Sequence, residues 1–198
     1  MIVFVKEPRP GRVKTRLGRE IGMTRAAWWF RHQTRALLRL LARDPRWVTV
    51  LAVSPDAEGL TSRCWPPGLA RWPQGGGDLG ARMARALNAM PPGPAMVIGA
   101  DIPGIRPHHI AEAFHLLGRH EAVLGPAPDG GYWLIGLKRG AQAMPAGLLT
   151  GVRWSSEHAR ADTERGLAPL RIAHAATLSD VDTAADLAAL SPRPVARS

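Results

Sequence analysis

Short apolar segments alternate with longer segments of helical periodicity along most of the chain, and this alternation restricts the possible folds more than any other feature. Residues 2–5, 47–53 and 95–99 are apolar runs of the length expected for buried strands. Helical patterns follow at 24–43, where Thr24 is a candidate N-cap, and at 79–87. Strands that alternate with helices predict an α/β sandwich with a mostly parallel sheet. Ligands of such folds bind beyond the carboxyl ends of the strands.

The second half of the chain continues the same alternation. Pro107 opens a helix that we expect to reach about Gly118, and Ser155 or Ser156 is a candidate cap for a later helix. The remaining predicted elements are strands at 121–125 and 132–137 around a turn at 126–131, and a last helix at 183–190. We expect one domain over residues 1–190 and a loose polar tail at 191–198.

Length and cysteine content exclude several classes of protein. A chain of 198 residues corresponds to one domain and buries enough surface to fold without disulfides. A single cysteine, Cys64, excludes a disulfide framework and a cysteine zinc cluster, and it fits a reducing compartment. Neither a signal segment nor 18 consecutive apolar residues occurs in the sequence, so we expect a cytoplasmic protein without a membrane partner.

Positive charge is concentrated at the start of the chain. The sequence has 26 Lys and Arg against 16 Asp and Glu, a net charge of +10. Residues 1–46 contain twelve of the cations and three of the acids, which accounts for +9. Either an anion binds the first quarter of the chain, or the arginines cover solvated faces. The stripe Arg31, Arg35, Arg39 and Arg43, at helical spacing, favours a solvated face.

A basic loop follows the first predicted strand. Residues 6–17 read KEPRPGRVKTRL, and Gly11 allows a tight turn there. In an extended loop the alternating Arg12, Lys14 and Arg16 would all face one side and suit a polyphosphate. The spacing from Gly11 to Lys14 and Thr15 does not match a Walker loop. The alternative is an exposed basic loop without a ligand.

A glycine-rich segment, residues 75–80, reads GGGDLG. It satisfies the dinucleotide-binding pattern literally, but it follows a short segment with Pro73 rather than a firm first strand. A loop that shapes a nucleotide or substrate pocket is the better interpretation. Asp78 is also a candidate N-cap for the helix at 79–87.

Aspartates mark two further element boundaries. Asp101 follows the most strand-like segment of the chain, so it is expected at the ligand-binding edge of the sheet. Together with Asp182 or Asp180 it could hold a divalent cation whose remaining ligands are phosphates and waters. The alternatives are a turn role for Asp101 and helix capping by Asp180 or Asp182.

A second turn, residues 128–133, reads PDGGYW and contains the only tyrosine, Tyr132. Asp129 could orient or deprotonate an acceptor hydroxyl, and Gly130 and Gly131 would let the backbone approach a ligand. A simple glycine turn between two strands is the alternative.

Taken together, these segments resemble a bacterial family of GT-A-fold, glycosyltransferase-like proteins that is catalogued with arsenosugar biosynthesis and radical-SAM gene neighbourhoods. The motifs occur in order over nearly the whole chain. They are VKEPRPGRVKTRL at 5–17, GDLGARM at 77–83, GADIP at 99–103, PDGGYW at 128–133, WSSE at 154–157 and DVDT at 180–183. The opening is also similar to 2-phospho-L-lactate guanylyltransferase and, more distantly, to molybdenum-cofactor nucleotidyltransferases. The chain has Ala81 where the family commonly has glutamate, which puts a catalytic role at that position in doubt.

The resemblance implies a single-domain nucleotide-diphospho-sugar transferase fold, a Rossmann-like three-layer sandwich. It implies magnesium or manganese at Asp101 and Asp182, and catalysis that depends on Lys14, Asp101 and Asp129. The nucleotide would bind Lys6, Gly11, Arg12, Lys14, Thr15, Arg16, Gly77, Asp78 and Arg82. The acceptor would bind Asp129, Gly130, Gly131, Tyr132, Trp133 and Trp154.

Three functions remain open at this point. The first is transfer of a sugar from a nucleotide sugar to a small acceptor, which the resemblance favours. The second is nucleotidyl transfer from a nucleoside triphosphate to a phosphorylated small molecule, which three loop cations fit slightly better. The third, non-enzymatic nucleic-acid binding, is disfavoured because the loop lacks interleaved aromatic residues and Asp101 would have no role. The sequence does not indicate the oligomeric state.

Overall fold

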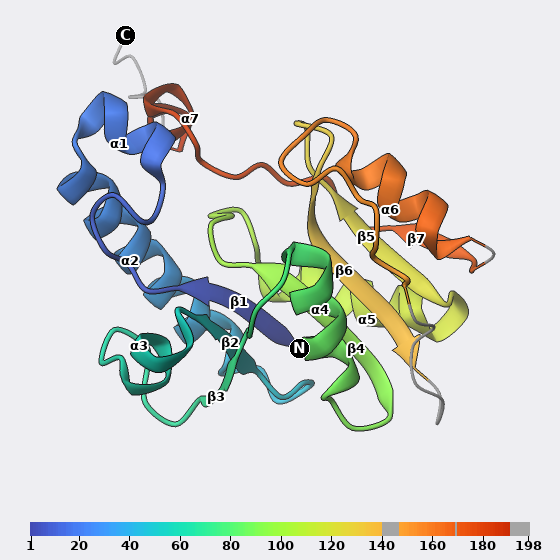
Figure 1. The fold of residues 1–198 in the computed structure, drawn as a ribbon. Coiled ribbons are helices and arrows are strands. Elements are labelled where there is room, and N and C mark those ends of the chain that lie inside the picture. Colours follow the sequence, from blue (N-terminus) through green and yellow to red (C-terminus); the bar gives the residue numbers. More distant parts are fainter. Residues whose placement is uncertain (140–146, 169, 191–198) are drawn as a thin grey trace, which may run out of the picture.

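A computed structural model describes residues 1–139, 147–168 and 170–190, and it shows one α/β domain built on a seven-stranded sheet (Figure 1). The strand order is β3-β2-β1-β4-β6-β5-β7. Only β6 runs antiparallel to its neighbours β4 and β5; the other paired strands are parallel. This confirms the expected mostly parallel sheet.

The strands are β1 (Ile2–Lys6), β2 (Val50–Ser54), β3 (Ala70–Pro73), β4 (Gly93–Gly99), β5 (Ala122–Pro126), β6 (Tyr132–Arg139) and β7 (Ile172–His174). The helices are α1 (Thr15–Ile21), α2 (Met23–Leu41), α3 (Asp56–Thr61), α4 (Leu79–Asn88), α5 (Pro107–Arg119), α6 (Ala159–Leu167) and α7 (Ala184–Ala189). Because β1 and β4 are adjacent and parallel, the loops that follow them meet at one edge of the sheet.

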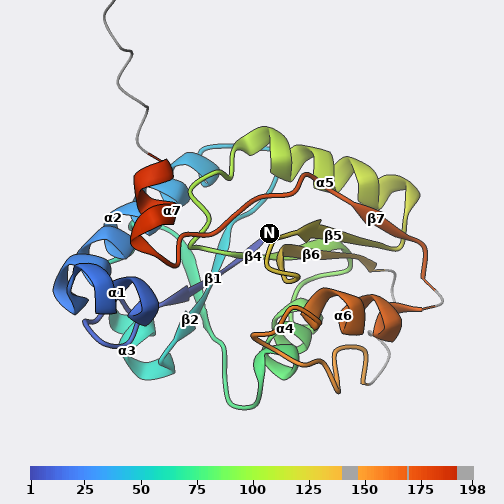
Figure 2. The ribbon, with the colours of Figure 1, turned by 90° about the horizontal axis from the view of Figure 1, so that it is seen from above.

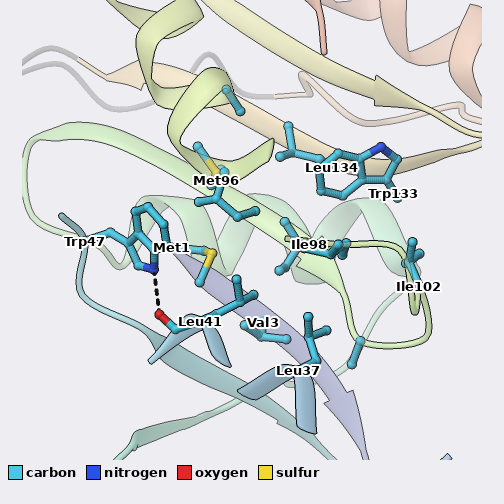
Figure 3. Packing of buried hydrophobic residues seen from close by; sticks show 14 of the residues in the cluster. Met1, Val3, Leu37, Leu41, Trp47, Met96, Ile98, Ile102, Trp133 and Leu134 are labelled. Atoms are coloured by element: carbon cyan, nitrogen blue, oxygen red, sulfur yellow. Dashed lines mark hydrogen bonds between the residues drawn. The ribbon is translucent and has the colours of Figure 1, made fainter. Parts of the chain in front are cut away.

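Helices cover both faces of the sheet, as Figure 2 shows with α2 and α5 on one side and α4 and α6 on the other. The larger apolar cluster packs α2 and α5 against the sheet through residues such as Leu38 and Leu117. Figure 3 shows Leu37 of α2 and Met96 of β4 in this cluster. On the other face, Leu87 of α4 and Leu167 of α6 belong to a second cluster. Strands buried on both faces explain why the strand segments read as continuous apolar runs.

Two further contacts connect neighbouring elements. Trp47, just before β2, donates its indole N–H to the Leu41 carbonyl at the end of α2, at 3.1 Å (Figure 3). Leu17 of α1, Ala26 of α2 and Val181 form a separate buried cluster. The C-terminal segment 175–183 therefore runs from β7 across the end of the sheet and anchors α7 beside α1 (Figure 1).

Several element boundaries differ from the sequence prediction. The long helix is capped at Gly22 rather than Thr24 and ends at Leu41, because the backbone at Gly22 has φ +95° and separates α1 from α2. Neither Ser155 nor Ser156 caps α6. Its N-cap is His158, and Ser156 Oγ instead donates to the Arg153 carbonyl at 2.7 Å.

Other elements agree with the sequence or were missed by it. Asp78 caps α4, accepting from the Ala81 N–H at 2.8 Å, as expected. The segment with Pro73 is the edge strand β3, where proline is tolerated. The short elements α1, α3 and β7 were not predicted. The tail at 191–198 lies outside the described residues. Within the described residues no helix combines the length and apolar character needed to cross a membrane.

Candidate functional site

The candidate site lies where the loops after β1 and β4 meet. Asp101 follows the end of β4 by two residues, and Gly99 gives its carboxylate room, because a Cβ at that position would lie 3.0 Å from Asp101 Oδ1. On the helix side, the buried Thr34 of α2 donates to the carbonyl of Ala100. The backbone beside Asp101 is therefore held in place by strand β4 on one side and by the hydrogen bond from α2 on the other.

Lys14 is the centre of this site. Its backbone is left-handed, with φ 44° and ψ 50°, a conformation that costs a lysine about 1 kcal/mol. Its side chain is only 6% exposed, and its ammonium lies 2.7 Å from Asp101 Oδ2, 2.8 Å from Asp182 Oδ1 and 3.3 Å from Asp180 Oδ2. Three carboxylates from two distant parts of the chain therefore converge on one buried cation.

The charges of this cluster shift one another's protonation equilibria. Burial alone would lower the pKa of Lys14, but attraction to Asp101 and hydrogen bonds to Asp101 and Asp182 outweigh it and raise that pKa. Burial works against ionisation of Asp182 as well, yet its bonds to Lys14 and Arg16 lower its pKa below the ordinary value. Asp180 differs, because burial and the neighbouring carboxylates together raise its pKa. Lys14 is thus held in its charged form.

The C-terminal segment brings Asp180 and Asp182 to the site. Val181 between them is 1% exposed and packs in the cluster with Leu17, so its two neighbours turn the other way, toward Lys14. Thr183, and neither aspartate, caps α7 by accepting from the Asp186 N–H. The capping alternative for Asp180 and Asp182 is therefore wrong, and both carboxylates are available to the site.

The basic loop does not present its cations as an extended strip, so that prediction was wrong. The chain turns into α1 at Thr15, directly after the left-handed Lys14. Arg12 reaches Glu58 at 3.4 Å on α3, while Arg16 lies 3.1 Å from Asp182 Oδ2. Lys6 is exposed and has no ion-pair partner among the described residues.

Two cavities adjoin at this edge of the sheet. The first, here called the loop cavity, measures about 470 Å³. It is lined by Phe4, Val5, Lys6, Arg12, Val13, Lys14, Thr15, Arg16, Phe30, Gln74, Leu79, Gly99, Ala100, Asp101 and Asp182. It therefore contains five of the residues expected to bind a nucleotide, whereas Gly11, Gly77, Asp78 and Arg82 do not line it.

Sequence reasoning missed Gln74, which also lines the loop cavity. The residue is 6% exposed, and its amide nitrogen donates to the carbonyls of Val5 at 3.2 Å and Ala52 at 2.9 Å. These two acceptors fix the orientation of the amide. The side-chain oxygen accepts no hydrogen bond from the described residues, so it remains available to a ligand. Its position directly before the glycine-rich loop was the only signal in the sequence.

The second cavity, here called the central cavity, measures about 440 Å³. Its lining includes Asp129, Gly131, Tyr132, Trp133 and Trp154 of the expected acceptor site. The residues that it shares with the loop cavity are Phe4, Arg16, Leu79, Gly99, Asp101 and Asp182. The carboxylates of Asp101 and Asp182 therefore stand where the two cavities meet.

Two glycines of the motifs, Gly80 and Gly130, are required by packing within the chain. A Cβ at Gly80 would lie 2.3 Å from the Leu149 carbonyl oxygen and 2.9 Å from the Trp154 ring. One at Gly130, where φ is +83°, would lie 2.2 Å from the Glu157 carbonyl oxygen. Gly130 does not line the central cavity, so its close approach is to Glu157 rather than to a ligand. Asp129 Oδ1 accepts from the Gly131 N–H at 2.9 Å, which shapes the turn.

Two carboxylates of the site, those of Asp101 and Asp182, are the candidate ligands for a divalent cation. Among the described residues, no three Asp, Glu, His or Cys side chains form a closed metal cage. Asp101 and Asp182 each give one oxygen to the Lys14 ammonium, and the second Asp182 oxygen pairs with Arg16, so a cation would share these carboxylates with the two basic side chains. The Asp101 and Asp182 side chains are 34% and 33% exposed. One or two carboxylates that leave room for phosphates and waters are typical of magnesium sites.

Comparison with known proteins agrees with the fold and defines the family. A proposed nucleotide-diphospho-sugar transferase from Desulfovibrio desulfuricans G20 is 30% identical, with a TM-score of 0.80 over 96% of this chain and 84% of that one. A Mycobacterium sp. strain JC1 homologue of Rv0371c is 15% identical, with a TM-score of 0.56 over 96% and 93%.

Rv0371c of Mycobacterium tuberculosis H37Rv, in a complex with manganese, is 15% identical, with a TM-score of 0.53 over 96% of each chain. No curated protein matches the sequence. The profile of a family described as uncharacterized proteins conserved in bacteria, DUF2064, matches residues 37–156. The alternating strands, the converging motifs and this match agree: the chain belongs to the DUF2064 family.

Proposed function

We propose that this protein is a metal-dependent transferase that moves a sugar from a nucleoside-diphosphate sugar to a small hydroxyl acceptor. The observation that carries the proposal is the position of Asp101 and Asp182. Their carboxylates lie between a cavity lined by Lys6 and Arg12 and a second cavity with aromatic walls. A donor with a diphosphate centre and a sugar at one end would span this junction.

The loop cavity suits the nucleotide half of such a donor. Lys6, Arg12 and Arg16 line it. The lysine ammonium can neutralise a phosphate oxygen as a point charge, and each arginine can donate two parallel hydrogen bonds to a phosphate group. Gln74 supplies one fixed hydrogen-bond acceptor for a base or ribose N–H or O–H. The family resemblance implies a nucleotide on the same loop, and the Desulfovibrio relative, described as a proposed nucleotide-diphospho-sugar transferase, supports a donor of this kind.

A divalent cation would be held by Asp101 and Asp182. When bound, it would neutralise charge on the leaving diphosphate. Lys14 orients these two carboxylates before the cation arrives, since its ammonium bonds one oxygen of each. The manganese complex of the more distant Rv0371c protein is consistent with such a cation on this fold.

The transfer itself requires one bond to form and one to break. The acceptor oxygen attacks the anomeric carbon, the bond from that carbon to the diphosphate oxygen breaks, and the nucleoside diphosphate leaves with the electron pair. The acceptor proton passes to a carboxylate, for which Asp129 is the candidate because it lines the central cavity and keeps one oxygen free of its turn.

The proposal is tested by incubating the protein with nucleoside-diphosphate sugars and magnesium or manganese. We expect slow release of free nucleoside diphosphate without an acceptor, and its loss on addition of a chelator. Asp101→Asn should abolish metal-dependent nucleotide binding while the fold is retained. A control is Glu112→Gln, which removes an exposed carboxylate of α5 that lines neither cavity. Unchanged metal-dependent affinity in Asp101→Asn would contradict the assignment.

Nucleotidyl transfer is the second candidate, and the cations of the loop cavity favour it. Lys6, Arg12 and Arg16 would also suit a triphosphate. In that reaction a substrate phosphate attacks the α-phosphate and pyrophosphate leaves. Pyrophosphate release from a nucleoside triphosphate and a phosphorylated acceptor, with no turnover of nucleotide sugars, would establish this reaction instead.

A further inference from the structure

The central cavity has largely apolar and aromatic walls. Its large apolar and aromatic lining residues include Phe4, Leu79, Met83, Tyr132, Ile135 and Trp154. Tyr132 and Trp154 lie with their rings edge to face, 6.4 Å apart between centroids. A volume of about 440 Å³ is typical of a small-molecule pocket. These walls suit a ligand with a flat apolar body better than a fully polar one.

The charges around the same cavity are strongly one-sided. Five carboxylates line it, those of Asp101, Asp129, Glu157, Asp180 and Asp182, against one cationic side chain, Arg16. Arg16 is already paired with Asp182, and Lys14 offsets further charge on the same side. Asp129 and Glu157 have no Lys or Arg partner within the part of the chain that the structure describes.

We propose that the acceptor of this enzyme carries neither a phosphate nor a carboxylate, and is an uncharged or cationic hydroxyl compound with an aromatic or similarly flat apolar body. An anionic acceptor would give up part of its hydration and meet Asp129, which has no basic partner among the described residues, and Glu157, whose nearest basic partner is His158 at 3.7 Å. That the bound compound is a sugar acceptor rests on the proposed function. The preference of the cavity for uncharged or cationic compounds rests on its lining alone.

The same charge pattern separates the two candidate reactions. Nucleotidyl transfer to a phosphorylated substrate would place a second phosphate in the central cavity. Sugar transfer to a hydroxyl group needs no charge there beyond the carboxylate that accepts the proton. The cavity lining therefore favours sugar transfer over nucleotidyl transfer, independently of the family resemblance.

The test uses phenols of nearly equal size that differ in the charge of one end: tyramine (cationic), tyrosol (neutral), phloretate (anionic) and tyrosol phosphate (anionic). Their affinities for the protein are measured by calorimetric titration without nucleotide, at neutral pH and low salt. Tyramine and tyrosol should bind at least about tenfold more tightly than phloretate and tyrosol phosphate. The double variant Asp129→Asn, Glu157→Gln should reduce this difference to about threefold, because both side chains are exposed and their removal leaves the walls intact.

Glu112→Gln is the matched control, since it removes one exposed carboxylate away from both cavities and should leave the order of affinities unchanged. Equal or tighter binding of the anionic probes would overturn the proposal. Failure of all four probes to bind would overturn it as well, because the walls would then not select an apolar body.

This experiment fails or succeeds separately from the proposed function. Selective binding of tyrosol and tyramine without turnover of any nucleotide sugar would leave the cavity assignment standing and remove the glycosyl donor. Turnover of a nucleotide sugar together with preference for the anionic probes would support the glycosyl donor and overturn the cavity assignment.

Discussion

At the scale of single residues, Lys14 has a different role from the one that a basic loop suggests. Its ammonium is buried and forms ion pairs with Asp101, Asp180 and Asp182 rather than being exposed to solvent. The sequence analysis placed Asp101 with Asp182 or Asp180 at one cation site, but it did not predict that Lys14 forms ion pairs with all three aspartates. The aspartates near the C-terminus lie 166 and 168 positions away from Lys14, and no local pattern carries that information.

Lys14→Met tests the structural part of this role. Without the ammonium, three partly exposed carboxylates face one another, and we expect a loss of about 2 kcal/mol in unfolding free energy at pH 7. The stabilisation by a lysine of raised pKa is complete below its unfolded pKa and is lost only as pH rises through the higher folded value.

In the variant, acid should relieve the repulsion among the carboxylates, so the difference from wild type should narrow between pH 7 and pH 4. Urea unfolding at both pH values measures this. Lys6→Met is the control, because Lys6 is exposed and unpaired within the described chain. Equal stability of Lys14→Met and wild type at pH 7 would show that the ion pairs contribute nothing.

Gly130 allows a prediction with a closely matched control. Ala at Gly130 (φ +83°) places a Cβ 2.2 Å from the Glu157 carbonyl oxygen, whereas Ala at Gly68 (φ +82°) meets nothing within 4 Å. Both variants carry the same backbone strain, about 1 kcal/mol. Gly130→Ala should lose about 2 kcal/mol more than Gly68→Ala, because the segment at Glu157 must move. Thermal unfolding compares the two, and equal losses would refute the contact.

At the scale of elements, the apolar pattern of the sequence predicts the strands that are buried on both faces, and it misses the short helices and strands. The strands β1, β2 and β4 and the helix α4 follow from apolar runs and from the cap at Asp78. The helix α1 has only seven residues and follows a left-handed lysine, and β7 has three residues at the edge of the sheet. Such elements depend on tertiary contacts, which no local window of sequence contains.

The edge strand β7 is held by one such contact, and its stability should depend on pH. Arg171 binds Glu121 through its side chain at 2.7 Å and its backbone N–H at 2.9 Å, and these bonds lower the pKa of Glu121 to about 2. A carboxylate of lowered pKa stabilises the fold above its unfolded pKa, about 4.3, and loses this effect as pH falls toward the folded value.

Glu121→Gln should therefore be less stable than wild type at pH 7, and the difference should shrink progressively from pH 4 to pH 3. Urea midpoints at the three pH values provide the measurement. The same substitution at Glu112, which is exposed on α5, serves as the control. A difference that stays constant down to pH 3 would mean that the charge of Glu121 does not contribute.

At the scale of the whole molecule, the net charge of +10 overstates the charge available to a ligand. The loop cavity contacts α2 only through Phe30, on the side opposite to solvent. Arg31, Arg39 and Arg43 are exposed and Arg35 is half-buried, and none has an ion-pair partner among the described residues. The stripe is a solvated face in the structure, as its spacing indicates.

A comparison of two charge-reduced variants tests whether the loop cations bind the ligand and the arginine stripe does not. Replacing all four arginines of the stripe by glutamine removes four charges, yet nucleoside diphosphate affinity should stay within about twofold at 0.15 M salt, where the screening length is about 8 Å. Lys6→Gln with Arg12→Gln removes only two charges but should weaken binding at least about tenfold, because both residues line the loop cavity. Titration with a fluorescent nucleoside diphosphate at several salt concentrations measures both. If affinity followed net charge, the stripe variant would lose more affinity than the loop variant, and the basic loop would have no special role in binding. A larger loss in the loop variant would locate the ligand in the loop cavity, which Lys6 and Arg12 line.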